Sequence, residues 1–323
     1  MNCAHRWIKI QGILVTLILI LVSQIRFSEA KLLVIGTTEH EALLARAVGG
    51  DIIEVRWIVG ADLDPQIAEP DESFIPILEQ ADILLVNGQG IEAGWLGPLL
   101  KQVKNKKIMP GQGGYVSLSE GVKLLPYAGG ELQESRFQEM MEAKGRRQIV
   151  ANHHYWLDPA NEIPMINNIK NGLSKIDPTN AKLYQSNAQE LIVRLEAKIK
   201  EWDAGMARFK GKKIIVYHRD WTYFAHRHGL EVVSYIEPKE LTRPKEVDFR
   251  NLTTRYKNQD VSIVLLSENE RPPFVDIDSI TQLAVKIHAH RVIMPDSMSP
   301  AEKRGDIISY FDYVYFVLTS ILK

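Results

Sequence analysis

The sequence contains almost no cysteine. Its 323 residues include a single one, Cys3, which precedes an apolar run near the N-terminus. Disulfide bonds therefore contribute nothing to the stability of the chain beyond that run. Any metal site there must be built from histidine and carboxylate ligands, because no thiolate is present.

The sequence also lacks an excess of charge of either sign. It has 39 basic and 40 acidic residues, for a formal net charge of −1, and contains no basic run. This balance argues against a nucleic-acid partner. A composition of 45% hydrophobic and 24% charged residues fits one or two globular α/β domains, and it excludes a disordered or collagenous chain.

The first 30 residues have the order of a secretory signal peptide. A basic flank over residues 5–9 precedes an apolar run from Ile13 to Val22 and the small-residue ending Ser28-Glu29-Ala30. We expect cleavage after Ala30, and a soluble periplasmic product because Cys3 comes too early to carry a lipid at the cut. An uncleaved anchor is the alternative, although the apolar run is short for a bilayer span.

The segment Asp177 to Phe209 predicts one long helix. Its apolar residues recur at steps of three and four, which places them on one stripe: Tyr184, Ala188, Leu191, Leu195, Ile199, Trp202, Met206 and Phe209. Asp177 and Pro178 suit a helix start, and Gly211 suits the residue just past the end. At 1.5 Å per residue the helix would be about 45 Å long.

Strands alternate with helices on both sides of this segment. We expect strands at Lys31–Gly36, Ile52–Val59, Asp82–Val86, Lys107–Met109, Lys213–Tyr217, Glu231–Tyr235, Ser262–Leu266 and Val292–Met294. We expect helices ending at Val48 and covering residues 74–78, 92–103, 161–173, 220–228, 249–258, 280–289 and 307–321. Residues 126–147 have weak periodicity and predict a mobile polar excursion.

This pattern predicts an α/β fold with two Rossmann-like lobes joined by the long helix. The expected divisions are a signal peptide over 1–30, lobes over 31–176 and 210–323, and the connecting helix over 177–209. A long core helix within a single domain is the alternative.

Ligands of such folds bind at the carboxyl ends of the parallel strands. A further short strand, expected at Ile149–Ala151, precedes His154. The side chains that follow expected strands and can bind a cation are Gln66, His154, His218, Glu268 and Asp296. Two imidazoles with one or two carboxylates would form a site for a first-row divalent cation in the crevice between the lobes.

Several motifs resemble one family, the zinc- and manganese-type solute-binding proteins of ABC metal-uptake systems. They are GADLDPQIAEP, ADILLVNGQGIEAGWL, NHHYWLDPAN, DPTNAKLYQSNAQ and VYHRDWTYFAHRHGLEVV, and the similarity covers nearly the whole mature chain. The resemblance implies a monomeric periplasmic receptor, not an enzyme. It would capture a divalent metal, Zn²⁺ first with Mn²⁺ or Fe²⁺ as alternatives, and deliver it to an ABC permease in the inner membrane.

The resemblance also assigns ligands. His154 corresponds to the second ligand of the family, with His153 where proline is usual, and His218 corresponds to the third. Histidine at that third place is similar to the zinc type, whereas the manganese type tends to carry glutamate. Asp296 stands near the family's aspartate, and Glu268, after a neighbouring strand, is the alternative.

The first ligand position departs from the family's Asp-Pro-His pattern, because Asp64-Pro65 is followed by Gln66. An amide oxygen is a poorer zinc donor than imidazole. Three alternatives follow: Gln66 binds weakly, His153 or His40 substitutes, or water fills the place. The histidine-rich acidic loop found in many zinc carriers of the family is absent, which weakens zinc only slightly because that loop is not the site.

Four further histidines, at positions 226, 228, 288 and 290, fall on expected helices and are interpreted as surface or capping residues. We assign no chemistry to Trp156, which we expect behind His154.

Three other functions compete with this one. A nucleotide-binding enzyme would use the glycines Gly88, Gly90 and Gly94 after a strand, but their spacing misses G-x-G-x-x-G. A zinc hydrolase would need a general base, and the sequence has no H-E-x-x-H. Adhesion by a surface-exposed relative is the third.

Overall fold

The computed structural model describes residues 31–69, 72–127, 151–239, 241–270, 275–299 and 304–322. Contacts divide the chain into Met1–Lys31 and a compact unit, Leu32–Lys323. None of the helices in the described ranges combines the length and the apolar character needed to cross a membrane.

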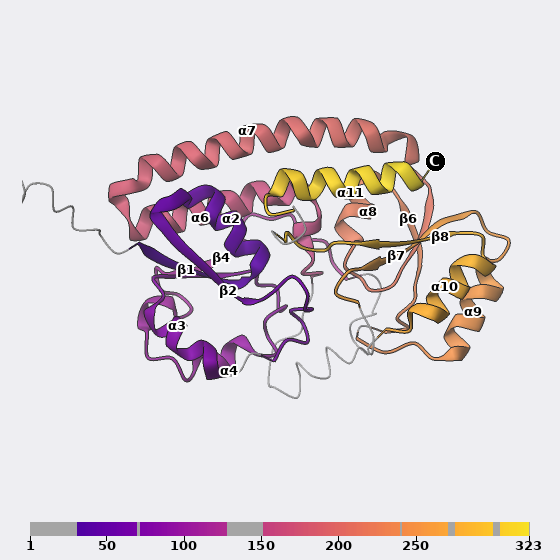
Figure 1. Ribbon diagram of the computed structural model, residues 1–323, viewed down its shortest axis with the longest axis horizontal. Coiled ribbons are helices and arrows are strands. Elements are labelled where there is room, and N and C mark those ends of the chain that lie inside the picture. Colours follow the sequence, from indigo (N-terminus) through magenta and orange to yellow (C-terminus); the bar gives the residue numbers. More distant parts are fainter. Residues whose placement is uncertain are drawn as a thin grey trace, which may run out of the picture. The chain divides into compact units, whose positions relative to one another are not determined.

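The first half of this unit is built on a four-stranded parallel sheet with the order β2-β1-β3-β4. Its strands are β1 (Leu32–Thr38), β2 (Ile53–Val59), β3 (Ile83–Val86) and β4 (Tyr115–Ser117). The helices of this half are α2 (Glu39–Gly49), α3 (Ile75–Gln80), α4 (Leu96–Leu100) and α6 (Glu162–Ile176) (Figure 1). Strand β3 is apolar and buried along its whole length, as a central strand covered on both faces must be.

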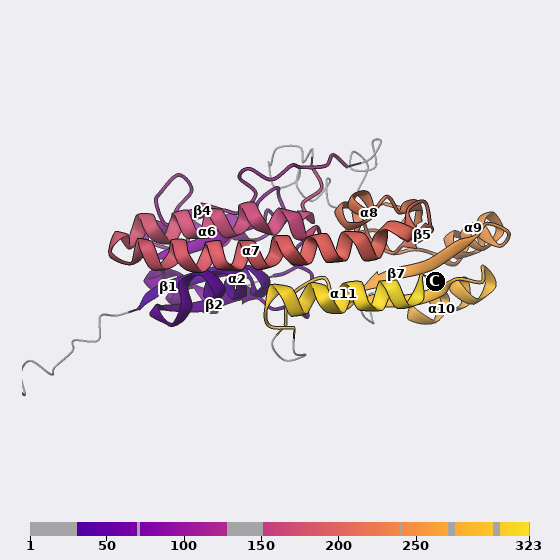
Figure 2. The same cartoon turned by 90° about the horizontal axis from the view of Figure 1, so that it is seen from above.

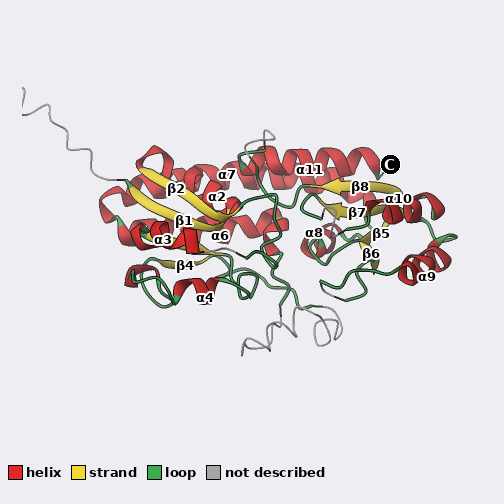
Figure 3. Ribbon diagram, turned by 60° about the horizontal axis from the view of Figure 1, so that its bottom comes forward, coloured by secondary structure: helices red, strands yellow, loops and turns green. Residues whose placement is uncertain are grey.

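The second half repeats the plan. Its four parallel strands have the order β6-β5-β7-β8 (Figure 3). They are β5 (Lys213–Val216), β6 (Glu231–Tyr235), β7 (Val261–Ser267) and β8 (His290–Met294), and the helices are α8 (Thr222–His228), α9 (Glu246–Tyr256), α10 (Ile277–Lys286) and α11 (Ile307–Ile321). The predicted α/β fold with two parallel sheets is confirmed.

The predicted long helix is also confirmed. Helix α7 spans Ala181–Met206 and is extended by short 3₁₀ turns at Pro178–Asn180 and Ala207–Phe209. The carboxylate of Asp177 caps its start, because it accepts the backbone N–H of Asn180 and the hydroxyl of Tyr184. Every residue of the predicted apolar stripe is buried.

Helix α7 packs on α2, α6 and α11 (Figure 2). Trp202 stacks on Tyr315 of α11, with ring centroids 4.9 Å apart, and its indole N–H donates to Asp312. One apolar cluster contains this stripe together with strand residues of both sheets, such as Val34 and Ile263. The two halves therefore share one core through α7, and the domain limits given above stay a prediction.

Two predicted elements in the first half are wrong. Residues Lys106–Ile108 form a 3₁₀ turn capped by Asn105, and the fourth strand is instead β4, at Tyr115–Ser117. The approach to β4 requires glycine, because a Cβ on Gly114 would lie 2.3 Å from the carbonyl oxygen of Asp82.

The helix expected over residues 92–103 is restricted to α4, and turns precede it. The Glu92 side chain folds back onto the backbone of Asn87 and Gly88, so the chain does not begin a regular helix there. Other elements differ from prediction by a few residues at their ends. Most of the predicted excursion over 126–147 lies outside the described residues.

Candidate metal-binding site

The structure brings three of the predicted site residues together. The imidazole rings of His154 and His218 are 5.1 Å apart between centroids and nearly perpendicular. Nε2 of His218 lies 2.9 Å from the amide oxygen of Gln66. His154 precedes a short 3₁₀ turn in the first half, and His218 follows β5 in the second, so two distant segments supply the rings. All three side chains are buried.

His154 is held as a neutral imidazole. Burial, and then the neighbouring His153 and His218, lower its pKa well below the usual value. Its Nδ1 lies 3.1 Å from Oδ1 of Asn152, which also accepts the backbone N–H of His154. An amide oxygen only accepts hydrogen bonds, so Nδ1 carries the proton and Nε2 keeps a free lone pair. That nitrogen is suited to bind a metal ion.

His218 lies between two oxygen acceptors. Its Nδ1 is 2.7 Å from Oε2 of Glu237, and its Nε2 faces Gln66. A carboxylate behind a histidine fixes the ring and raises its basicity as a ligand. A metal ion at Nε2 therefore has to break the contact with the amide of Gln66.

The two predicted carboxylates have different surroundings. Asp296 is buried, and its backbone carbonyl accepts the indole N–H of Trp156, whose ring lies 5.3 Å from that of His154. Trp156 thus packs beside His154, as expected. Burial, and then the charge of Asp220, raise the pKa of Asp296 well above the usual value. A cation close to this carboxyl would favour its ionised form.

The carboxylate of Glu268 is occupied by Arg304, whose guanidinium donates to both oxygens at 3.1 and 2.7 Å. A bidentate pair of this kind is among the stronger charge-assisted contacts in proteins. Of the two predicted carboxylates, Asp296 is therefore the better candidate, since Glu268 would have to give up an ion pair to bind a metal.

The two substitutes considered for Gln66 also differ. Nε2 of His40 pairs with the carboxylate of Glu162 at 2.8 Å, and its Nδ1 faces the backbone N–H of Met298 at 3.4 Å. His40 is thus engaged through both nitrogens. His153 is fully buried, and its ring centroid is 4.4 Å from that of His154. Only His153 of these two contacts a histidine of the site.

Across the described ranges, no group of three or more His, Cys, Asp or Glu has an arrangement that could hold a metal ion. The structure brings together two imidazoles, those of His154 and His218, and the amide of Gln66. Gln66 stands at the position where the family pattern has a third histidine. Closing a shell around a cation therefore requires Gln66 to leave Nε2 of His218 and a carboxylate to approach.

Sequence reasoning missed three polar residues around the histidines: Asn152, Asp220 and Glu237. Asp220 is buried, accepts the hydroxyl of Ser267 and the backbone N–H of Trp221, and has a pKa that burial raises. Glu237 comes two residues after β6. The rule that selects side chains after strand ends would have found it.

A buried pair of carboxylates was also missed. The single hydroxyl of Thr37 lies 2.7 Å from Oε2 of Glu41 and 2.8 Å from Oε1 of Glu92. One hydroxyl proton can serve only one of them, so the second carboxyl must itself be protonated to donate. Burial raises the pKa of Glu92 to about 7 and that of Glu41 well above its usual value.

This pair accounts for the glycine turn. The carboxylate of Glu92 accepts the backbone N–H groups of Asn87, at 2.6 Å, and Gly88, at 3.1 Å. Gly88 and Gly90 have positive φ angles, a conformation that favours glycine and lets the chain turn tightly here. The Glu92 side chain already occupies the amides of Asn87 and Gly88, so these amides are not available to a nucleotide phosphate.

Among the four other histidines, His226, His288 and His290 are exposed, as expected. The expected helix is wrong for two of them, because His288 follows the end of α10 and His290 begins β8. The prediction for His228 is wrong, because this residue is 7% exposed and its Nε2 bonds the hydroxyl of Tyr315 at 2.8 Å. It belongs to the packing between α8 and α11.

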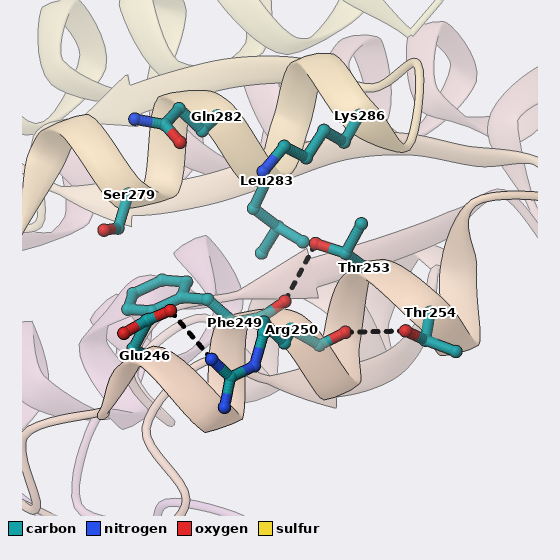
Figure 4. A pocket seen from close by; sticks show the side chains of 9 residues that line it. All are labelled: Glu246, Phe249, Arg250, Thr253, Thr254, Ser279, Gln282, Leu283 and Lys286. Atoms are coloured by element: carbon teal, nitrogen blue, oxygen red, sulfur yellow. Dashed lines mark hydrogen bonds and ion pairs between the residues drawn. The ribbon is translucent and has the colours of Figure 1, made fainter.

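A separate cavity of about 300 Å³ lies between α9 and α10 (Figure 4). Its walls carry mainly hydroxyl, amide and charged side chains. Arg250 is paired with Glu246, and the hydroxyls of Thr253 and Thr254 donate to carbonyls of their own helix. Its polar groups are thus largely engaged within α9, and it contains no histidine.

Comparisons with known proteins agree with this arrangement. A sequence model of the family described as "Zinc-uptake complex component A periplasmic" matches residues 34–323. The zinc-binding lipoprotein AdcA of Streptococcus pneumoniae is 24% identical over 256 residues, which cover 79% of this chain and 49% of AdcA. The chain thus spans about half the length of that relative.

The manganese ABC transporter substrate-binding lipoprotein PsaA of Streptococcus mitis is 25% identical over 301 residues, covering 92% of this chain and 90% of PsaA. Among solved structures, ZnuA aligns with a TM-score of 0.69 at 19% identity, over 91% of this chain and 100% of that one. A cadmium-bound periplasmic metal-binding protein from Candidatus Liberibacter asiaticus aligns with a TM-score of 0.70 at 16% identity, with the same coverage. These structures share the fold.

Proposed function

The chain belongs to the family of periplasmic zinc-uptake component A proteins, and we therefore propose that it is the receptor that captures metal for an ABC importer. Its substrate is a divalent cation, bound between His154 and His218. Members of this family are solute-binding receptors, so no catalytic group is assigned.

One observation carries the proposal. Two buried imidazoles from segments 64 positions apart in the sequence lie 5.1 Å apart, and one of them is a neutral ring with a free nitrogen. Each ring also has a polar partner at its Nδ1: Asn152 for His154 and Glu237 for His218. Packing of the two rings alone would not require these partners. Paired ligands with such supporting partners are characteristic of metal sites.

We propose Zn²⁺ as the physiological cargo, with Mn²⁺ and Fe²⁺ as the alternatives. Two imidazoles suit zinc, and Asp296 supplies the carboxylate, while Glu268 is kept in place by Arg304. Gln66 either contributes its amide oxygen or yields its place to His153 or water. An amide oxygen suits a harder cation than zinc, so a metal shell that includes Gln66 would favour Mn²⁺.

The proposed setting is the periplasm, with export directed by residues 1–30, and the proposed partner is an ABC permease in the inner membrane. A monomer is sufficient for this function, because both histidines come from the same chain.

Calorimetric titration with zinc tests the proposal. Metal-stripped protein should bind one Zn²⁺ tightly, and the double variant His154→Ala with His218→Ala should lose that site. His226→Ala with His290→Ala is the matched control, because it also removes two imidazoles but from exposed positions. Tight binding retained in the first double variant would refute the assignment. Parallel titrations with Mn²⁺ and Fe²⁺ rank the three metals.

A further inference from the structure

We propose that Asn152 is a positioning residue that ties the ring of His154 to the backbone beside His218. The inference rests on the proposed function, because the hydrogen bonds of Asn152 are assigned to the same metal site. Asn152 is 1% exposed, and its side chain makes hydrogen bonds to both segments that carry the histidines.

The oxygen side of the amide acts on His154. Oδ1 accepts the backbone N–H of His154 at 2.9 Å and its Nδ1–H at 3.1 Å. A backbone N–H can only donate, so it fixes which end of the amide faces this histidine. The same oxygen then selects the tautomer with the proton on Nδ1, and Nε2 is left as the ligand atom.

The nitrogen side acts on the second segment. Nδ2 donates to the carbonyl of Arg219 at 2.7 Å and to the hydroxyl of Thr222 at 3.3 Å. Arg219 directly follows His218 in the sequence. A carbonyl can only accept, so this end of the amide is fixed independently. The two halves of one amide therefore hold both ligand segments in register.

The backbone of Asn152 is anchored as well. Its carbonyl accepts the hydroxyl of Tyr223 at 2.7 Å, and its N–H donates to Leu125 at 2.9 Å. The amide thus acts from a fixed point. Movement of either histidine away from the other costs hydrogen bonds that water cannot replace in a buried place.

The first test measures zinc binding. Asn152→Ala removes the hydrogen bonds to both His154 and the Arg219 carbonyl. Loss of a residue that supports a ligand typically weakens metal affinity by about 10-fold to 100-fold. Asn105→Ala is the matched control, because the Asn105 amide likewise donates two hydrogen bonds and accepts a backbone N–H, but in the turn before β4 and to two backbone carbonyls. We expect Asn105→Ala to lower stability without changing the dissociation constant.

The second test needs no metal. The ¹H–¹⁵N spectrum of the imidazole nitrogens should show His154 protonated at Nδ1, with the signal assigned by its absence in His154→Ala. Asn152→Ala should shift that ring toward the Nε2–H form. Asn152→Asp keeps the acceptor but loses the donor, so it should leave the His154 tautomer in place and shift the ring signals of His218.

An Asn152→Ala protein with wild-type zinc affinity and an unchanged His154 tautomer would overturn the inference, as would unchanged His218 signals in Asn152→Asp. If the wild-type protein binds no divalent cation, the proposed function fails, whereas the metal-free spectra still decide whether Asn152 sets the two rings.

Discussion

Replacing Glu92 by glutamine removes a buried carboxyl whose ionisation opposes folding. Burial raises its pKa from 4.5 to about 7, so between these values the folded protein binds a proton that the unfolded chain has released. The stability contributed by the protonated carboxyl is fully present below pH 4.5 and is lost as the pH rises through 7. Glutamine is always neutral, so the variant should not show this loss.

The size of the effect follows from the two pKa values. At 1.36 kcal/mol per pKa unit, Glu92 costs on the order of 1 kcal/mol at pH 5 and on the order of 3 kcal/mol at pH 8. The free energy of unfolding of Glu92→Gln, relative to that of the wild type, should therefore rise by roughly 2 kcal/mol over this interval. The amide oxygen of glutamine can still accept the N–H groups of Asn87 and Gly88.

The assay is urea unfolding followed by tryptophan fluorescence, at pH 5, 6, 7 and 8. Glu196→Gln on the exposed side of α7 is the control, because it removes the same charge without burial. A difference between Glu92→Gln and the wild type that stays constant with pH would show that Glu92 takes up no proton on folding, and the raised pKa of Glu92 would then be wrong.

Three further predictions concern the site and the core. Gln66→His should tighten zinc binding by about tenfold in calorimetry, because imidazole is the better donor, and no change would place Gln66 outside the metal shell. Burial lowers the pKa of His228 to about 4, so its neutral form stabilises the fold above pH 6.5 and this contribution is lost as the pH falls through 4. Relative to His228→Gln, the wild type should lose about 3 kcal/mol between pH 7 and pH 4 in urea titrations, and parallel curves would refute this. Leu195→Ala, at a fully buried position of α7, should cost about 2–5 kcal/mol in a single thermal transition, and a second transition would argue against a shared core.

Much of the fold is predictable because it depends on spacing. The stripe from Tyr184 to Phe209 determines which face of α7 is buried, whatever packs against it. The strand at Lys107–Met109 could not be placed from spacing. There, the close passage of Gly114 along the backbone of Asp82 selects a later segment as β4, and such a contact is not encoded in local periodicity.

The candidate site is likewise predictable only in part. The strand-end rule leads correctly to His218, which follows the parallel strand β5. It also selects His154, but the described pairing before that residue is an antiparallel bridge between Ala151 and Pro126. It does not show that Glu268 is held by Arg304, nor that Asn152 reaches the Arg219 carbonyl. These pairings join residues far apart in the chain, so they depend on the finished tertiary structure. Family resemblance points to ligands, but not to the partners that orient them.

The unbroken apolar cluster through α7 also limits how this molecule can be divided or recombined. A fragment that stops before α7 leaves the apolar faces of α2 and α6 uncovered, and one that starts after it does the same to α11. Exchanging one half with a relative must therefore transfer the matching flank of α7, so that the graft boundary falls inside a helix and not in a linker.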